Sequence, residues 1–242
     1  MATSFLKRIV GAGGRFSPAA PDQPLFVIGD LHGRADLLDK LLDQARDGEQ
    51  IICVGDYVDR GENSADVLAR LHETPDILCL KGNHEDMLLG FLEDPENAGP
   101  SWLRYGGLQT LASFGVPGIS ERMRGGELTA ARDEMVKRMG NAQVEWLQTM
   151  PLFYETGNVA IVHAGADPVC PIAQQSNTVL MWGHPEFRKT TRPDGIWVVH
   201  GHTIVDEPMV KDGRISVDTG AYATGRLTAV RIGADGIEFV RA

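Results

Sequence analysis

The chain lacks long hydrophobic runs, has little cysteine and carries fewer basic than acidic residues. No stretch of about 18 apolar residues occurs, which excludes a membrane-spanning helix. Only three cysteines are present, and two of them, Cys53 and Cys79, lie inside apolar segments. We therefore expect no disulfide framework and a reducing, cytoplasmic location. The 33 acidic residues outnumber the 23 basic residues, and the net charge of −10 argues against a broad surface that binds nucleic acid.

Length and composition predict one folded domain preceded by a short arm. The 242 residues are 43% hydrophobic and 23% charged, which is typical of a globular protein with a sizeable core. Residues 11–24 are rich in glycine, proline and alanine. We therefore expect residues 1–22 to form a flexible arm and residues 23–242 to form a single domain. The apolar stretch Ile9-Val10 is too short for a signal peptide.

Hydrophobic patterning predicts an α/β fold. Apolar segments at 25–28, 51–54 and 77–80 predict buried strands, and each is followed by leucines at helical spacing. Residues 93–150 predict a helical insert of two or three helices, interrupted at Pro95, Pro100 and Gly106-Gly107. Strand patterns return after residue 151, at 152–154, 159–163, 197–199, 215–217, 227–232 and 237–240. We expect two mixed β-sheets that pack face to face, with helices outside.

Polar side chains follow each of the first three predicted strands. Asp30 and His32 follow the first, Asp56 and Asp59 the second, and Asn83 and His84 the third. Because ligands bind outside the carboxyl ends of parallel strands, we expect these side chains to converge. Two later histidines, His163 and His202, also follow apolar segments. Carboxylate, amide and imidazole ligands without a thiolate suit Mn, Fe, Zn or Ni, so the pattern predicts a metal site.

Three signatures occur in order along the chain. They are Gly-Asp-x-His-Gly at 29–33, Gly-Asp-x-x-Asp-Arg-Gly at 55–61 and Gly-Asn-His-Glu at 82–85, and His163-Ala164-Gly165 and Gly201-His202-Thr203 follow them. With these motifs the chain resembles the calcineurin-like metallophosphoesterase superfamily, and within it the phosphoprotein phosphatase branch with its bacterial and bacteriophage serine/threonine protein phosphatases. The resemblance covers residues 25–240. It implies a sandwich of two mixed β-sheets flanked by helices.

The resemblance also implies a centre for two divalent metal ions, with Mn²⁺ expected and Fe, Zn or Ni as alternatives. The first ion would be held by Asp30, His32 and Asp56, and the second by Asp56, Asn83, His163 and His202. A hydroxide activated by both metals would attack phosphorus. His84 would act as general acid and Asp59 would orient it, while Arg60 and Asn83 would bind the phosphate.

Some positions depart from the family pattern or have two interpretations. The second phosphate-binding arginine, expected after Trp182, is replaced by His184, and either His184 or Arg188 would take its role. Strand alternation places His200 and His202 on one face, and the Gly-His-Thr pattern selects His202 as the ligand. Tyr222 is interpreted as a packed strand-end residue, with a place beside the site as the alternative.

These residues favour a metal-dependent phosphomonoester hydrolase, specifically a serine/threonine protein phosphatase with a phosphorylated protein or peptide as partner. Neither nucleic acid nor membrane is expected as a partner. The alternative is a dinucleoside polyphosphate hydrolase, such as a diadenosine tetraphosphate hydrolase. That group usually has glutamine where this chain has His32, which favours the phosphatase. A non-catalytic phosphoprotein-binding module is disfavoured, because every ligand position and the His84–Asp59 pair are present. The substrate, the native metal and the oligomeric state stay open.

Overall fold

Two mixed β-sheets form the centre of the molecule, as the sequence predicts. The computed structural model describes residues 8–9 and 16–242. Within these residues, the first sheet has the spatial order β1-β11-β10-β2-β3-β4 and the second has the order β5-β6-β7-β9-β8. The strands of the first sheet are β1 (Arg8–Ile9), β2 (Leu25–Ile28), β3 (Gln50–Cys53), β4 (Leu78–Cys79), β10 (Thr228–Gly233) and β11 (Gly236–Arg241). Those of the second are β5 (Phe153–Thr156), β6 (Val159–Val162), β7 (Trp197–His200), β8 (Met209–Lys211) and β9 (Arg214–Ser216).

Each sheet combines parallel and antiparallel strand pairs. Strands β2, β3 and β4 pair in parallel, as do β6, β7 and β9. Strand β10 pairs antiparallel with both β2 and β11, and β5 and β8 are antiparallel to β6 and β9. The carboxyl ends of the parallel strands therefore lie at one edge of each sheet, which is where the predicted site residues follow them.

Strand β2 is apolar throughout because both of its faces are buried. Leu25 and Val27 pack in the core between the two sheets, while Phe26 and Ile28 pack against helices on the outer face. All four side chains are fully buried. A strand that is buried on both faces needs apolar residues at every position, which is why it reads as an unbroken hydrophobic run.

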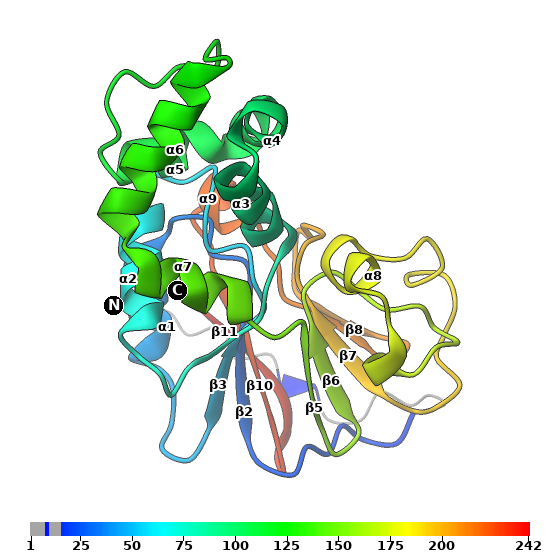
Figure 1. The fold of residues 1–242 in the computed structure, drawn as a ribbon. Coiled ribbons are helices and arrows are strands. Elements are labelled where there is room, and N and C mark those ends of the chain that lie inside the picture. Colours follow the sequence, from blue (N-terminus) through cyan, green and yellow to red (C-terminus); the bar gives the residue numbers. More distant parts are fainter. Residues whose placement is uncertain (1–7, 10–15) are drawn as a thin grey trace.

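Helices cover both outer faces of the sandwich (Figure 1). Helices α1 (Ala35–Leu42) and α2 (Ser64–His72) lie over the first sheet and bury the leucine and valine face that the sequence predicts. Helix α8 (Asn177–Trp182) lies over the second sheet, where Leu180 joins a core with Val162 and Val198. No helix in the described part of the chain is both long and apolar enough to cross a membrane.

The insert between the two halves is more helical than expected. After α3 (Asn83–Glu93) come α4 (Pro95–Trp102), a π-helical turn η1 (Leu103–Gly107), α5 (Leu108–Ser113), α6 (Gly126–Met139) and α7 (Asn141–Thr149). Helices α3 to α6 stand above the strands at the top of Figure 1. The predicted break at Pro95 is confirmed, because α3 ends at Glu93 and α4 begins at Pro95, where the missing N–H of proline needs no partner. The predicted break at Pro100 is wrong, because this residue lies inside α4, whereas the chain is kinked at Gly106, whose φ of 109° is not helical.

The predicted N-terminal arm falls partly outside the described residues. Residues 1–7 and 10–15 are not described. Arg8–Ile9 pairs with β11, and Phe16 packs at 5.3 Å against the ring of Trp197. Asn158, in the turn between β5 and β6, accepts from the backbone N–H of Ala20 at 2.7 Å and donates to the carbonyl of Pro18 at 3.0 Å. The described part of the arm is therefore attached to both sheets, through contacts that composition does not reveal.

Candidate active site

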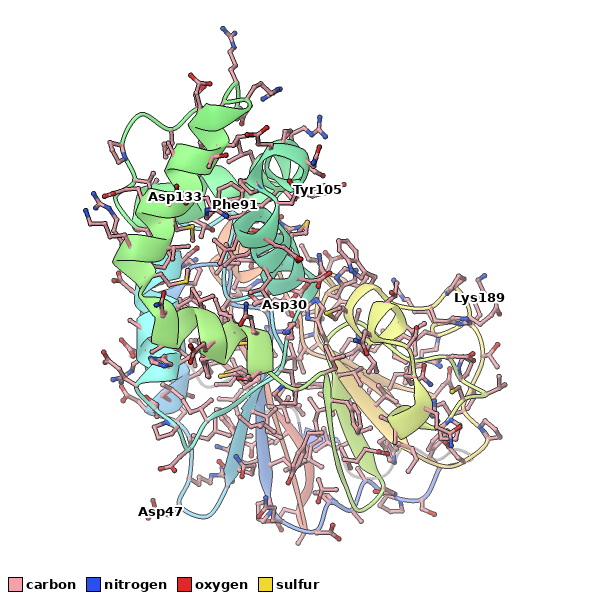
Figure 2. All side chains as sticks on the ribbon, in the orientation of Figure 1. Asp30, Asp47, Phe91, Tyr105, Asp133 and Lys189 are labelled. Atoms are coloured by element: carbon pink, nitrogen blue, oxygen red, sulfur yellow. The ribbon has the colours of Figure 1, made fainter. Side chains whose placement is uncertain are left out.

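The predicted metal-binding residues converge at the carboxyl ends of the central strands. Asp30, Asp56 and Asn83 follow the first sheet's parallel strands, and His163 and His202 follow β6 and β7 of the second. Figure 2 labels Asp30 at this position, above the strands and below the insert helices. The grouped metal-binding side chains fall into two sets, His32 with Asp56 and His84, and Asp56 with His163 and His202. Asp56 belongs to both sets, as the two-metal pattern implies.

Asp56 is the centre of the cluster. Its Oδ1 lies 3.3 Å from His163 Nε2, and its Oδ2 lies 3.6 Å from His32 Nε2. The backbone N–H of His84 also donates to Oδ1 at 3.0 Å. Burial alone would raise the pKa of Asp56, but the imidazoles of His163, His84 and His32 hold the pKa of this carboxyl below its usual value. Asp56 is therefore the ionised ligand of the group.

Asn83 and Asp30 connect the two sheets. Asn83 Oδ1 lies 2.9 Å from His163 Nε2 and 2.8 Å from His202 Nδ1. Asp30 accepts the backbone N–H of His202 with both oxygens, at 3.2 and 3.0 Å. A Cβ on Gly201 would overlap Asp30 Oδ1, so only glycine permits this approach. The glycine of the Gly-His-Thr signature thus has a structural reason.

The ring orientations fit a bound cation. His32 Nδ1 lies 2.8 Å from the Val58 carbonyl and His163 Nδ1 lies 3.1 Å from the Val54 carbonyl. A carbonyl oxygen only accepts, so each Nδ1 carries the proton and each Nε2 presents a lone pair. These lone pairs face the oxygens of Asp56 and Asn83, which also accept. Buried lone pairs that face one another have no proton to share, and a divalent metal ion would accept electron density from all of them.

Electrostatics support the same conclusion. Burial lowers the pKa of His32 to about 3 and that of His163 to about 4, so both rings are neutral ligands at neutral pH. Burial, with the nearby Asp218 and Asp56 carboxylates, raises the pKa of Asp30 well above its usual value. Asp218, whose pKa burial raises to about 6, was missed by sequence reasoning. Because these carboxylates lie close together, each makes ionisation of the others less favourable, and a bound cation would stabilise their ionised forms.

His84 and Asp59 form a buried hydrogen-bonded pair. His84 Nδ1 lies 2.6 Å from Asp59 Oδ2, and both side chains are almost fully buried. Nδ1 donates to the carboxylate, so His84 Nε2 is the free nitrogen on the cluster side, 4.0 Å from Asp56 Oδ2. Burial opposes protonation of His84, but Asp56 and Asp59 together raise its pKa. The pair can therefore carry a proton into the site, the task predicted for a general acid.

Arg60 and Tyr222 lie at the rim of the cluster. Arg60 Nη1 is 3.2 Å from His32 Nε2, and its guanidinium carbon is 5.1 Å from the centre of the Tyr222 ring. The Tyr222 ring also meets the His32 ring edge-on at 5.2 Å. The interpretation of Tyr222 as only a packed strand-end residue is wrong, because α9 (Ala221–Thr224) turns this ring toward the site.

The two remaining histidines are placed differently. His200 Nε2 is bonded to the Ser216 hydroxyl at 2.9 Å and its ring packs on Phe187, so the preference for His202 over His200 agrees with their contacts. The hydrogen bond shown for His184 stays in its own loop, where Nδ1 accepts from Glu186 N at 3.3 Å. Trp182 of the same segment lies with its ring 6.5 Å from that of His202. The predicted phosphate-binding role of His184 stays a prediction.

Glu85 has a role that the sequence did not suggest. Its buried carboxylate accepts the backbone N–H groups of Asp56 at 2.8 Å, Tyr57 at 2.7 Å and Gly82 at 2.9 Å. It therefore ties the second and third signature loops together. Glu85 is the last residue of the Gly-Asn-His-Glu motif, but the motif does not reveal which backbone groups its side chain binds.

The site loops are conformationally strained. Of the described non-glycine residues with positive φ, all but Asp212 lie here, namely His32, Asp56, Asp59, Arg60 and His202. Such conformations are rarely adopted by side-chain-bearing residues and persist only where surrounding contacts hold them. Strained backbone of this kind gathers at functional sites, which supports this cluster as the candidate active site.

Comparison with known proteins identifies the family. The family model described as calcineurin-like phosphoesterase matches residues 24–206. The chain belongs to this family. Members use divalent metal ions, in agreement with the ligand set described above.

Relatives within this family have two kinds of name. A bis(5′-nucleosyl)-tetraphosphatase of Oceanobacillus iheyensis is 26% identical over 235 residues, covering 85% of this chain and 87% of its own. Serine/threonine-protein phosphatase 2 of Escherichia coli K12 is 28% identical over 223 residues, covering 86% and 92%. A crystal structure of a putative diadenosine tetraphosphatase has a TM-score of 0.60 at 18% identity, over 94% of this chain and 99% of that one, and supports the fold.

Proposed function

We propose that this phosphoesterase hydrolyses phosphomonoesters of alcohols, with phosphoserine and phosphothreonine in proteins or peptides as the substrate class. The observation that carries the proposal is the buried His84–Asp59 pair, with its free Nε2 on the cluster side. A departing serine or threonine alkoxide is strongly basic and needs a proton, whereas a phosphate released from an anhydride leaves without one. A positioned acid is therefore worth most for a phosphomonoester.

The chain's own residues have distinct tasks in this reaction. Two divalent ions, Mn²⁺ in our proposal, would be held by Asp30, His32, Asp56, Asn83, His163 and His202. Bound there, they would supply positive charge for the phosphate and acidify a water molecule. Arg60 binds phosphate oxygens with its planar guanidinium. His84 Nε2 delivers its proton to the leaving oxygen, while Asp59 keeps the ring oriented and stabilises the protonated form.

Asymmetric hydrolysis of dinucleoside tetraphosphates is the second candidate. The relative from Oceanobacillus iheyensis carries that name. The rim of the cluster also offers two exposed aromatic rings, Tyr222 at 36% and Trp182 at 43% exposure, next to His32 and His202. Aromatic rings beside a phosphate site can stack on nucleobases. This observation favours a nucleotide substrate and supports dinucleoside tetraphosphate hydrolysis as the second candidate function.

We also propose a cytoplasmic location. The three cysteines are free, and Cys53 and Cys79 are buried in neighbouring strands of the first sheet. Reduced thiols are the norm in the cytosol, whereas secreted proteins usually pair them.

Two substrates separate the candidates. The protein is stripped of metal with a chelator, and phosphate release is measured as Mn²⁺ is added back, with a phosphoserine/phosphothreonine peptide and diadenosine tetraphosphate in parallel. Metal-dependent release from the peptide is the expected result. Turnover of the dinucleotide alone would replace the leading proposal by the second candidate. No turnover of either by metal-loaded protein would contradict both and restore the binding-module alternative.

A further inference from the structure

Asp59 is held mainly by residues of the helical insert. Its side chain is completely buried and binds no other charged group than His84 among the contacts described. The indole Nε1–H of Trp102 lies 3.0 Å from both carboxylate oxygens, and the Thr110 hydroxyl donates to Oδ1 at 2.7 Å. Trp102 and Thr110 follow Asp59 by 43 and 51 positions. The insert therefore supplies two of the donors that hold this carboxylate.

Both insert donors are themselves held in place. Trp102 is buried, and its ring stacks on Phe91 with centroids 4.4 Å apart and planes 25° apart. Thr110 is fully buried, and its hydroxyl accepts the backbone N–H of Asp59 at 2.8 Å while it donates to the Asp59 carboxylate. Figure 2 labels Phe91, which belongs to α3, above Asp30. Donors with so little freedom define one orientation of Asp59.

The insert also contacts Arg60, which follows Asp59 in the chain. The backbone N–H of Arg60 donates to the Gly106 carbonyl at 3.3 Å. Asp59 and Arg60 both have left-handed backbone conformations, with φ of 70° and 68°. Gly106 has φ of 109°, and a Cβ there would overlap Arg60 N. The kink at Gly106 within η1 places this carbonyl.

We infer that the helical insert is part of the reaction machinery. Trp102 and Thr110 are positioning residues that act through Asp59 on His84, and Gly106 positions Arg60 through the backbone. The inference rests on the proposed role of His84 as general acid. Without the indole N–H, the Asp59 carboxylate can rotate, and the His84 ring it orients then misses the leaving oxygen. Small errors of position cost large factors in rate, because the acid must meet the leaving group in one geometry.

Leaving-group dependence tests this inference. We compare Trp102→Phe, which keeps an aromatic ring on Phe91 but removes the N–H, with Trp146→Phe as control. Trp146 belongs to the same insert, and its ring contacts His72 instead of the site. Thr110→Val removes the second donor, and Thr110→Ser keeps a hydroxyl. Each variant is assayed with a phosphoserine peptide and with 4-nitrophenyl phosphate, whose nitrophenolate leaves without protonation.

The expected result is a selective loss. Trp102→Phe and Thr110→Val lower kcat for the peptide by about 10–100-fold and for 4-nitrophenyl phosphate by much less. Thr110→Ser and Trp146→Phe keep the wild-type ratio of the two rates. Equal losses on both substrates would overturn the inference, because damage to the fold or to metal binding does not distinguish leaving groups.

A spectroscopic readout separates this inference from the proposed function. In protein labelled with ¹⁵N-histidine, the Nδ1–H proton of His84 is assigned as the signal lost in His84→Asn. Trp102→Phe is expected to shift this signal, and Trp146→Phe to leave it unchanged. Inactivity of the wild type on the peptide would reject the proposed function, whereas an unmoved signal in Trp102→Phe would reject the positioning role.

Gly106→Ala tests the contact with Arg60. We expect KM for both substrates to rise by about tenfold, because the displaced guanidinium binds phosphate less well. Gly90→Ala is the matched control, since Gly90 lies in α3 with only Ala98 Cβ, at 3.8 Å, near the added methyl group. An unchanged KM in Gly106→Ala would contradict the Gly106 role.

Discussion

The strand-end loops and the helical insert contribute to one site in different ways. The loops carry the proposed metal ligands and substrate-binding residues, which follow strands of the two sheets. The insert contributes Trp102, Gly106 and Thr110, which form hydrogen bonds with Asp59 and Arg60. The proposed metal ligands are thus held by the two sheets, while the proposed acid pair and Arg60 also depend on contacts from a separate helical element.

Asp56→Asn should disrupt metal binding at the strand-end loops and have the largest effect on activity. The substitution removes the charge shared by both sets of ligands, so we expect loss of tight Mn²⁺ binding and a fall in activity of about 10⁴-fold or more. Calorimetric titration of Mn²⁺ and phosphate release measure the two effects. Asp39→Asn, at an exposed position of α1, is the control. Wild-type metal affinity in Asp56→Asn would refute its bridging position.

His84→Asn should separate the acid from the metal cluster. We expect Mn²⁺ binding to persist while kcat for a phosphoserine peptide falls by about 10³-fold, since the leaving alkoxide loses its proton donor. The fall for 4-nitrophenyl phosphate should be clearly smaller. A variant that loses metal as well would show that His84, which groups with His32 and Asp56, is a ligand instead.

His184→Arg should strengthen phosphate binding next to the second sheet. An arginine offers a fork of donors where the chain has histidine, and we expect KM for a phosphomonoester to fall by about tenfold. Arg188→Ala is measured in parallel. A rise of KM in Arg188→Ala, with no change in His184→Arg, would assign the phosphate-binding role to Arg188.

His200→Gln should weaken the pH dependence of stability on the acid side. Burial lowers the pKa of His200 to about 4 from its usual 6.5, so the unfolded chain takes up a proton at higher pH than the folded protein. The stability from this group is present above pH 6.5 and is lost as the pH falls toward 4. Urea unfolding of metal-free protein at pH 7 and 4.5 should show a smaller acid loss in His200→Gln, by at most about 1.4 kcal/mol per pH unit. Identical losses in both proteins would contradict this contribution.

The sequence by itself determined the parts of the molecule that local patterns encode. Strand β2 is recognisable because it is apolar at every position, as is β6 of the second sheet, and β3 is apolar after Gln50. Asp30, Asp56 and Asn83 are recognisable because each follows a strand within a short signature. Parallel strands end at one edge, so these residues had to converge, and the two-sheet fold and the family followed from them.

Only the tertiary structure decided which distant residues support the site. Trp102 and Thr110 lie in helices without a signature and reach Asp59 over 43 and 51 positions of chain. Tyr222 turns toward His32 because a short helix follows the last strand of the second sheet. Residues 18–20 attach to Asn158 through backbone groups that every sequence possesses. Such contacts depend on how the chain packs, and they cannot be predicted from hydrophobic periodicity or motif spacing in the sequence.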